Sequence, residues 1–322
     1  MFIRSRFGLA VLSAFLLAFA ANATAANWKK LSPANSPSPR LSPMMAYDPV
    51  SQKIVLFGGV GSAGYLGDTW TFDGTNWTQE NPAVAPPGRT SGNMTYDRAT
   101  KKLVLFGGYA GNGQYLNDTW LWDGAASSWI QTSPGLSPTA ATAPLVFTDP
   151  KTGHAMTWGG FDGHLYQNTT WQWTGTTWRK LTTSQTPFAR SCSLYGFDQG
   201  HNEVVVFSGL SDGNPNNTWT WDGTDWTLQN PQTQPPGRYC GAGAYDSALR
   251  GFVGFGGGIG GPDLNDTWLW DGTNWQAVLT NHKPPPREGA GMAYDTALGH
   301  IILFGGLQNS KTALGDTWKL LP

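Results

Sequence analysis

Short apolar runs separated by glycine- and aspartate-rich segments follow one another along the chain from residue 27 onward. The runs at 53–57 and 102–106 are rich in Leu, Val and Phe, and each leads into a Gly-Gly pair. Runs of this length between turn residues are typical of buried β-strands. Asp-Gly pairs such as Asp73-Gly74 predict tight hairpin turns, because both residue types tolerate a positive φ. The pattern therefore predicts an all-β chain.

The apolar runs and the residues around them repeat along the chain. A Gly-Gly pair or its equivalent recurs every 48 to 52 residues, and a tryptophan that mostly follows Asp-Thr recurs in step with it. The pairs begin at Gly58, Gly107, Gly159, Ser208, Gly256 and Gly305, and the tryptophans are Trp70, Trp120, Trp171, Trp219, Trp268 and Trp318. Each repeat holds four short strands. Because such a small sheet cannot bury both faces alone, a radial arrangement as a six-bladed β-propeller is predicted.

The two ends of the chain complement each other. The sixth repeat stops shortly after Trp318 and has no fourth strand, whereas the residues around Trp28 match the fourth-strand pattern around Trp77. We therefore expect the N-terminal strand to complete the last blade and close the ring. Residues 26–322 are predicted to form a single propeller domain.

Three features of the repeat carry a resemblance to a known family. The Gly-Gly pair, the downstream tryptophan and the Tyr-Asp that ends the first strand, as at Tyr47-Asp48, resemble the Kelch repeat over residues 27–322. This resemblance implies a six-bladed Kelch-type propeller. The family includes adaptor domains, copper radical oxidases of the galactose-oxidase type and bacterial sialic-acid mutarotases, so the fold alone does not select an activity.

Residues 1–25 have the pattern of a secretory signal peptide, in which Arg4 and Arg6 precede an apolar run and small residues follow at the cleavage region. The run is too short to span a bilayer, and no later run reaches that length. Charged residues make up 13% of the chain and the net charge is −1, which predicts no nucleic-acid partner. We expect a secreted or periplasmic monomer without a membrane span after cleavage of the signal.

Most of the residues that suggest chemistry fall at repeat positions. All 17 tryptophans do so, which favours a scaffold role over a sugar-binding platform. The aspartates mostly belong to Tyr-Asp, Asp-Thr-Trp or Asp-Gly segments, where they serve as turn and loop acceptors. No matching pair of histidines accompanies a cysteine free to join a tyrosine, which disfavours a copper radical oxidase. No metal and no cofactor are predicted.

Binding residues are expected at the end of the propeller that carries the loops of variable length. Arginines entering the first strand of five blades suit an anionic or hydroxyl-rich ligand, although they could equally bond neighbouring loops. Tyrosines and one glutamate accompany them. The candidates are Arg40, Arg89, Arg190, Arg238, Arg287, Tyr65, Tyr115, Tyr166, Tyr239 and Glu288.

Three functions remain open on these residues. The first is a binding or interaction module that recognises an unknown protein or carbohydrate on the Arg/Tyr-rich loops. The alternative is a sugar-acting enzyme that resembles the mutarotases, with Glu288 as a weak candidate for the acid or base beside Arg190, Arg238 or Arg287. The third is a structural scaffold in an extracellular assembly.

The two cysteines lie one repeat apart. Cys192 and Cys240 each follow an arginine by two positions, which places them at equivalent points of adjacent inner strands. In an exported protein this spacing predicts a disulfide between the fourth and fifth blades. The alternative is a pair of buried thiols.

Overall fold

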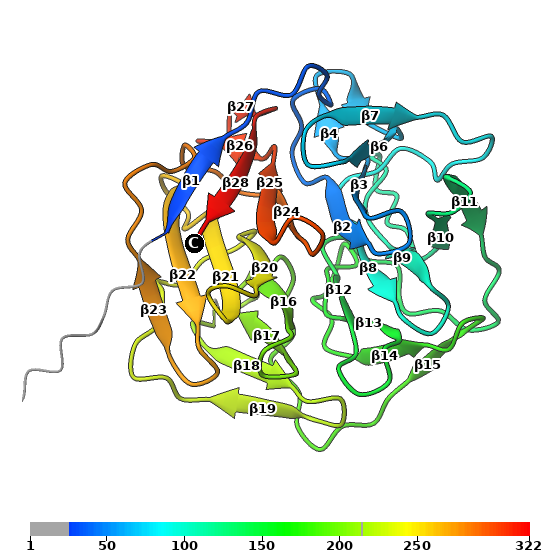
Figure 1. The fold of residues 1–322 in the computed structure, drawn as a ribbon. Coiled ribbons are helices and arrows are strands. Elements are labelled where there is room, and N and C mark those ends of the chain that lie inside the picture. The colour runs from blue at the N-terminus through cyan, green and yellow to red at the C-terminus, as the bar shows by residue number, and fades with distance from the viewer. Residues whose placement is uncertain (1–25, 214) are drawn as a thin grey trace, which may run out of the picture.

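The fold is a six-bladed propeller, shown in Figure 1 as a computed structural model that describes residues 26–213 and 215–322. Six four-stranded antiparallel sheets surround a central axis. The predicted all-β, six-bladed architecture is confirmed. The predicted signal peptide lies outside the described residues. Within the described residues, no helix has the length and hydrophobicity needed to span a membrane.

The first three blades follow in chain order, each from its inner to its outer strand. Blade 1 contains β2 (Met44–Asp48), β3 (Lys53–Phe57), β6 (Thr69–Phe72) and β7 (Trp77–Glu80). Blade 2 contains β8 (Asn93–Asp97), β9 (Lys102–Phe106), β10 (Thr119–Asp123) and β11 (Ser128–Gln131). Blade 3 contains β12 (Leu145–Thr148), β13 (Ala155–Trp158), β14 (Thr170–Trp173) and β15 (Trp178–Lys180).

The other three blades continue the same order. Blade 4 contains β16 (Leu194–Asp198), β17 (Glu203–Phe207), β18 (Thr218–Trp221) and β19 (Trp226–Gln229). Blade 5 contains β20 (Ala242–Asp246), β21 (Gly251–Gly257), β22 (Leu264–Trp270) and β23 (Trp275–Val278). Blade 6 contains β24 (Gly291–Asp295), β25 (His300–Phe304), β28 (Thr317–Leu321) and the N-terminal β1 (Asn27–Lys30). Two short ribbons, β4 (Val60–Gly61) with β5 (Gly64–Tyr65) and β26 (Leu307–Gln308) with β27 (Thr312–Ala313), lie in loops.

The N-terminal strand closes the ring as the sequence predicts. In Figure 1 the blue β1 lies beside the red β28, and the two strands pair antiparallel with Trp28 opposite Leu320. Trp28 is buried against Phe255 of blade 5. The last blade is therefore assembled from both ends of the chain.

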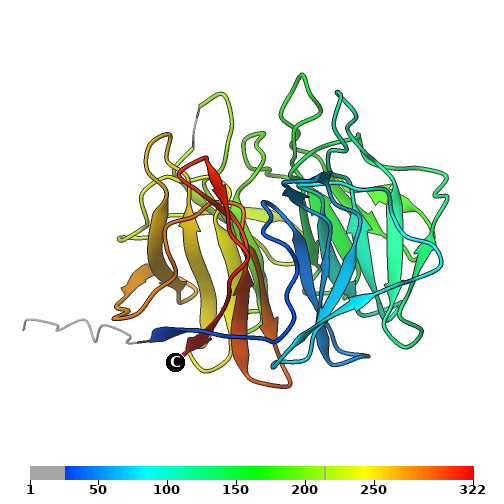
Figure 2. The ribbon, with the colours of Figure 1, turned by 90° about the horizontal axis from the view of Figure 1, so that it is seen from above.

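The propeller has two chemically different ends, which can be followed in the side view of Figure 2. The loop face carries the loops that enter the inner strands and those that join the second strand of a blade to the third. The turn face carries the tight turns after the Tyr-Asp pairs and the Asp-Gly turns. This division follows from the antiparallel order of the four strands in every blade.

Adjacent blades are joined by buried hydrogen bonds from tryptophan to threonine. A tryptophan of the outer strand donates its indole N–H to a threonine of the third strand of the preceding blade, over 2.8–3.0 Å. The pairs are Trp77–Thr317, Trp129–Thr69, Trp178–Thr119, Trp226–Thr170, Trp275–Thr218 and Trp28–Thr267. These bonds satisfy the polar atom of a large apolar side chain, so tryptophan can fill the space between blades without an unpaired donor.

A second circle of bonds surrounds the axis near the loop face. One residue just before each inner strand donates its backbone N–H to the corresponding carbonyl of the preceding blade, over 2.6–3.3 Å. The six residues, Ser42, Ser91, Ala143, Cys192, Cys240 and Gly289, all have a left-handed φ of 47° to 59°. We call them the axial ring. Cys192 and Cys240 are also joined by a disulfide, the pairing that their spacing suggested, with 4.6 Å between their Cα atoms.

Loss of this disulfide should weaken the fold without abolishing it. The bridge closes a segment of 48 residues, and a loop of that size is worth about 2–4 kcal/mol. We expect the double variant Cys192→Ser with Cys240→Ser to unfold in urea with a free energy lower by that amount. Its circular dichroism should match the wild type, because the axial ring and the tryptophan bonds remain. An unfolding midpoint equal to that of the oxidised wild type would contradict this expectation.

Candidate functional site

The arginines predicted to bind a ligand lie inside the protein instead. Arg40, Arg89, Arg190, Arg238 and Arg287 are at most 2% exposed. In four blades the guanidinium makes two hydrogen bonds of 2.5–3.0 Å to the aspartate of the Asp-Thr-Trp segment in its own blade. The pairs are Arg40–Asp68, Arg89–Asp118, Arg238–Asp266 and Arg287–Asp316. A bidentate pair uses the planar fork that an external carboxylate would need.

This finding corrects the expectation of an arginine-lined binding surface. The spacing placed the arginines at the correct end of each blade, but each side chain turns inward to hold the loop between the second and third strands. Asp68 illustrates the energetics: burial raises the pKa of its carboxyl, but bonds from Arg40 and Trp70 outweigh burial, and the pKa lies below its usual value. Such pairs stabilise the fold above the ordinary aspartate pKa and are lost as the pH falls through the lowered one.

Two blades depart from this pairing, blade 3 at both positions and blade 4 at one. In blade 3 the arginine is replaced by Ala141 and the aspartate by Thr169. In blade 4 the arginine remains, but its partner is Asn217, whose Oδ1 accepts a bond of 2.9 Å from Nη1 of Arg190. Nη2 of Arg190 is buried with no partner, and burial lowers the pKa of this guanidinium to about 10.

Aromatic side chains lie along the loop face at blades 1 to 3. Tyr65, Tyr115 and Tyr166 occupy one repeat position, three residues before the aspartate of the Asp-Thr-Trp segment or its replacement. Tyr109 and Phe161 lie between them and were not predicted. The five rings form a continuous row across blades 1 to 3, with successive centroids 5.7, 5.1, 6.3 and 5.0 Å apart. We call this row the aromatic arc.

Glycines allow the aromatic arc to cross the boundaries between blades. A Cβ added at Gly111 would lie 2.5 Å from Cε2 of Tyr65, and one at Gly163 would lie 2.6 Å from Cε2 of Tyr115. Each tyrosine therefore lies against the loop of the next blade. Tyr65 remains 41% exposed, and the other four rings are half-buried. The arc presents a broad, rigid apolar surface with hydroxyl groups.

The remaining two candidates lie together on the loop face at blades 5 and 6. Tyr239 and Glu288 occupy the same repeat position, directly after the arginine, and pair with Gly258 and Leu307. A Cβ at Gly258 would lie 2.5 Å from the Tyr239 ring and 2.6 Å from Oε2 of Glu288, so both side chains converge there. Burial, and after it the negative charge of Asp263, raises the pKa of Glu288.

Asp263 is a neighbour that the sequence did not identify as part of this group. It is 7% exposed, and its carboxylate accepts the backbone N–H of Asn309. It occupies the repeat position that carries Tyr65, Tyr115 and Tyr166 in blades 1 to 3. An alignment of the repeats would have shown this equivalence and so pointed to Asp263 as a residue of the loop face.

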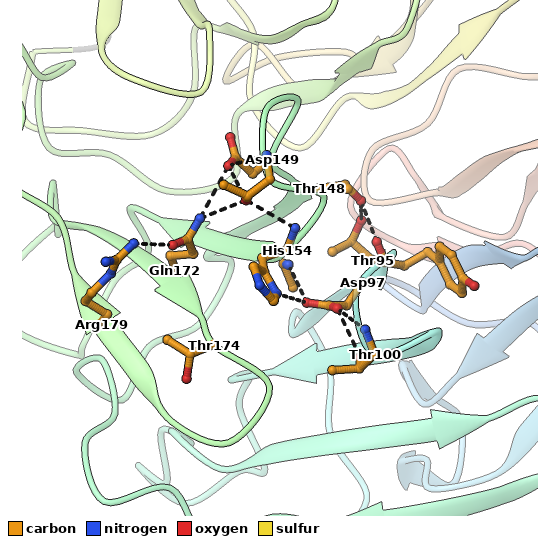
Figure 3. A network of polar contacts seen from close by, with 12 residues as sticks. Thr95, Asp97, Thr100, Thr148, Asp149, His154, Gln172, Thr174 and Arg179 are labelled. Atoms are coloured by element: carbon orange, nitrogen blue, oxygen red, sulfur yellow. Dashed lines mark hydrogen bonds and ion pairs between the residues drawn. The ribbon is translucent and has the colours of Figure 1, made fainter.

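The turn face carries polar networks that join neighbouring blades. Figure 3 shows the one between blades 2 and 3, in which Asp97 accepts bonds from Nδ1 of His154 over 3.1 Å and from the backbone of Thr100 over 2.7 Å. In the same view Arg179 donates to Gln172, which in turn donates to Asp149. These residues hold the turns and the first residues of the second strands in place. Their polar groups are hydrogen-bonded to one another.

The described residues contain no free cysteine for the cysteine–tyrosine link of a copper radical oxidase. Within residues 26–213 and 215–322, no three His, Cys, Asp or Glu side chains are grouped so that they could hold a metal ion. Cys192 and Cys240 are both consumed by the disulfide, so neither is free to cross-link to a tyrosine. A radical oxidase therefore finds no support in this arrangement.

Comparison with known proteins places the fold in a family. The family model described as the KLHDC2/KLHL20/DRC7 Kelch-repeats domain matches residues 14–193, more than half of the chain. The chain belongs to the Kelch-repeat family. Among solved structures, 390 chains match, and the structure of YjhT superimposes with a TM-score of 0.68 at 15% identity, covering 88% of this chain and 95% of that one. At this identity the likeness shows the fold alone. No curated protein sequence matches the chain.

Completing the Arg190 pair should stabilise the protein. Asn217→Asp offers Nη2 an acceptor and balances a buried charge, so we expect the free energy of unfolding to rise by about 1–2 kcal/mol. Urea denaturation measures this change. The matched control is Asn216→Asp, which adds the same charge at the exposed neighbouring position and should leave stability nearly unchanged. Equal effects of the two variants would show that Arg190 has no need of a second acceptor.

Proposed function

We propose that the protein is an exported binding module whose ligand contacts the aromatic arc on the loop face. The observation that carries this proposal is the continuous row of five rings from Tyr65 to Tyr166. The proposal does not rely on the arginines, because all five are buried and four of them are paired with an aspartate of their own blade. The residues proposed to contact the ligand are therefore the aromatic side chains of the arc, without the arginines.

The chemistry of the arc favours a carbohydrate or a protein segment with apolar and hydroxyl groups. Tyrosine offers a flat apolar face and a polar tip, and its two side-chain torsions mean that little conformational entropy is lost on binding. The contacts between neighbouring rings and glycines fix the rings before a ligand arrives, which reduces the ordering cost of association. The described side chains of the arc carry no charge, so an ionic ligand would find no partner there.

Screening the mature protein against a glycan array and an extracellular protein extract should identify a ligand. We then expect Tyr65→Ala combined with Tyr115→Ala to reduce affinity at least about tenfold, because aromatic anchors contribute most at such surfaces. The control is Ile130→Ala, which removes an exposed apolar side chain of similar accessibility from outer strand β11. Loss of affinity in the control, or full affinity in the double variant, would place the ligand elsewhere.

A sugar-acting enzyme is the second candidate, supported by the convergence of Glu288, Tyr239 and Asp263. Burial and the charge of Asp263 raise the pKa of Glu288, and a carboxylate with a raised pKa is a stronger base toward a sugar hydroxyl. Here the ligand would lie at blades 5 and 6 instead of on the aromatic arc.

Anomerisation of free sugars, followed by proton NMR, tests this second candidate. If Glu288 acts as the base, Glu288→Gln should abolish the activity. The rate of the wild type should rise as the pH increases through the raised pKa of Glu288. Asp263→Asn should shift this rise to lower pH, because the variant removes the negative charge that raises the pKa. Wild-type rates equal to those in buffer would end the enzyme hypothesis for the sugars tested.

A further inference from the structure

A cavity of about 250 Å³ occupies the axis of the propeller on its turn-face side. The side chains directly before the aspartates of the Tyr-Asp segments form its outer rim: Tyr47, Tyr96, Thr148, Phe197, Tyr245 and Tyr294. We call these six residues the axial rim. Its five aromatic side chains are half-buried. Met45, Met94 and Met292 lie deeper along the same strands and also line the cavity.

Toward the loop face the cavity adjoins a second, smaller space of about 80 Å³, and Tyr195 and Asn93 border both spaces. The hydroxyl of Tyr195 lies 3.3–3.4 Å from the backbone N and O of Val146, and Asn93 donates to the carbonyl of Pro144 over 2.6 Å. These cross-blade bonds fix the side chains that lie between the two spaces. We call the cavity of about 250 Å³ the axial cup, because its aromatic rim lies on the turn face.

The lining of the cup contains no charged side chain, but negative charge surrounds it. The aspartates that follow the rim residues are at most 1% exposed, and they are Asp48, Asp97, Asp149, Asp198, Asp246 and Asp295. Within the described residues, their only ion-pair partners are His154 and His201. Oδ2 of Asp246 and Oδ2 of Asp295 have no hydrogen-bond partner. Burial raises the pKa of Asp246 and of Asp295, so their negative charge is fully present only above the raised pKa. Buried carboxylates that are ionised make the potential in the cup favourable to a cation.

The protein already places one organic cation against the axial rim. The guanidinium carbon of Arg98 lies 5.4 Å from the centre of the Phe197 ring. Arg98 belongs to blade 2 and Phe197 to blade 4, so the side chain reaches across the rim position of blade 3, where the short Thr148 stands in place of an aromatic residue. The contact is an internal example of the cation–π interaction that the rim can offer.

From these observations we infer that the axial cup is a binding site for a small organic cation of the quaternary ammonium class. Aromatic faces bind such cations through the ring quadrupole, and methionine sulfur and methyl groups supply an adaptable apolar floor. The cup is smaller than most ligand pockets, which restricts the occupant to a compact headgroup. Tyr245 and Tyr294 form one corner of the cage, with ring centres 6.2 Å apart and planes inclined by 73°.

The ionisation of two rim tyrosines agrees with this electrostatic picture. Burial, and after it the charges of Asp48 and Asp97, raises the pKa of Tyr96. Burial, and after it Asp198, also raises the pKa of Tyr245. The rings thus remain neutral and keep their electron-rich faces, while the carboxylates that disfavour a phenolate favour a cation.

Isothermal titration with choline and with its neutral isostere 3,3-dimethylbutan-1-ol tests the inference on the unmodified protein. The two molecules have nearly the same shape, so the ratio of their affinities isolates the charge. We expect choline to bind at the cup at least about tenfold more tightly, in the range of a desolvated cation–π contact. Equal affinities, or no binding of choline at millimolar concentration, would overturn the inference without the need for any variant.

Substitutions locate the site and separate ring from hydroxyl. Tyr245→Ala should weaken choline binding at least about fivefold, whereas Tyr245→Phe should retain it, because the ring face carries the interaction. Arg98→Ala should bind choline as well as the wild type or better, since it removes a positive charge from the rim. Tyr109→Ala, on the loop face, is the control and should bind normally. Wild-type affinity in Tyr245→Ala would place the cation outside the cup.

This inference is independent of the proposed function. The rim of the cup lies on the turn face and the aromatic arc lies on the loop face. Failure of choline to bind would leave a loop-face ligand untouched, and failure of the loop-face variants would leave the cup untouched.

Discussion

The hydrogen bond from an outer-strand tryptophan to a threonine of the preceding blade is the contact on which the rest of the structure depends. A four-stranded blade has two apolar faces and no helix to cover either, so each face must be covered by a neighbour. Tryptophan is large enough to fill that space, but its indole N–H would be costly to bury unpaired. A threonine of the third strand removes this cost in all six interfaces. The bond from Trp28 to Thr267 shows that even the strand borrowed from the N-terminus obeys the rule.

Each position of the repeat thus makes a particular contact. A blade with a different residue at that position shows how the structure changes when the contact is lost. The Asp-Thr-Trp segment uses its aspartate to hold an arginine, its threonine to accept an indole from the next blade, and its tryptophan to pack between blades. Blade 3 lacks both members of the arginine pair and also has a threonine in the axial rim. A repeat that loses both partners together leaves no buried charge behind, whereas blade 4, which loses only the aspartate, retains an unpaired Nη2 on Arg190.

The sequence alone predicts the fold well because each sequence repeat corresponds to one blade. The Gly-Gly and Asp-Thr-Trp spacings predict six blades, the match of Trp28 to Trp77 predicts closure, and the spacing of Cys192 and Cys240 predicts their pairing. The candidate site was harder to predict. Spacing along a strand shows at which end of the blade a residue lies. It does not show whether the side chain is buried or exposed. For this reason the buried Arg40 was predicted to lie on the surface. The joint loss at Ala141 and Thr169 was the available sign that this arginine has an internal partner.

Contacts between repeats explain the other features that the sequence did not reveal. Tyr109 and Phe161 join the aromatic arc only because loops of successive blades lie side by side. The axial rim is composed of residues that each belong to an ordinary Tyr-Asp turn, and their common environment exists only once the ring has closed. In both cases the property arises from the assembly of repeats, and no single repeat contains it.

The axial ring has a consequence for how the molecule could relate two ligands. Its six backbone bonds all run in the same direction around the axis and return to their starting point, so the in-plane components of the amide dipoles cancel around the circle. The disulfide locks one step of this circle, and Tyr195 and Asn93 lie between the two axial spaces. The two sites proposed above lie on opposite faces of the propeller, one on the loop face and one on the turn face. Two proposed sites placed in this way would be free to serve different partners at the same time.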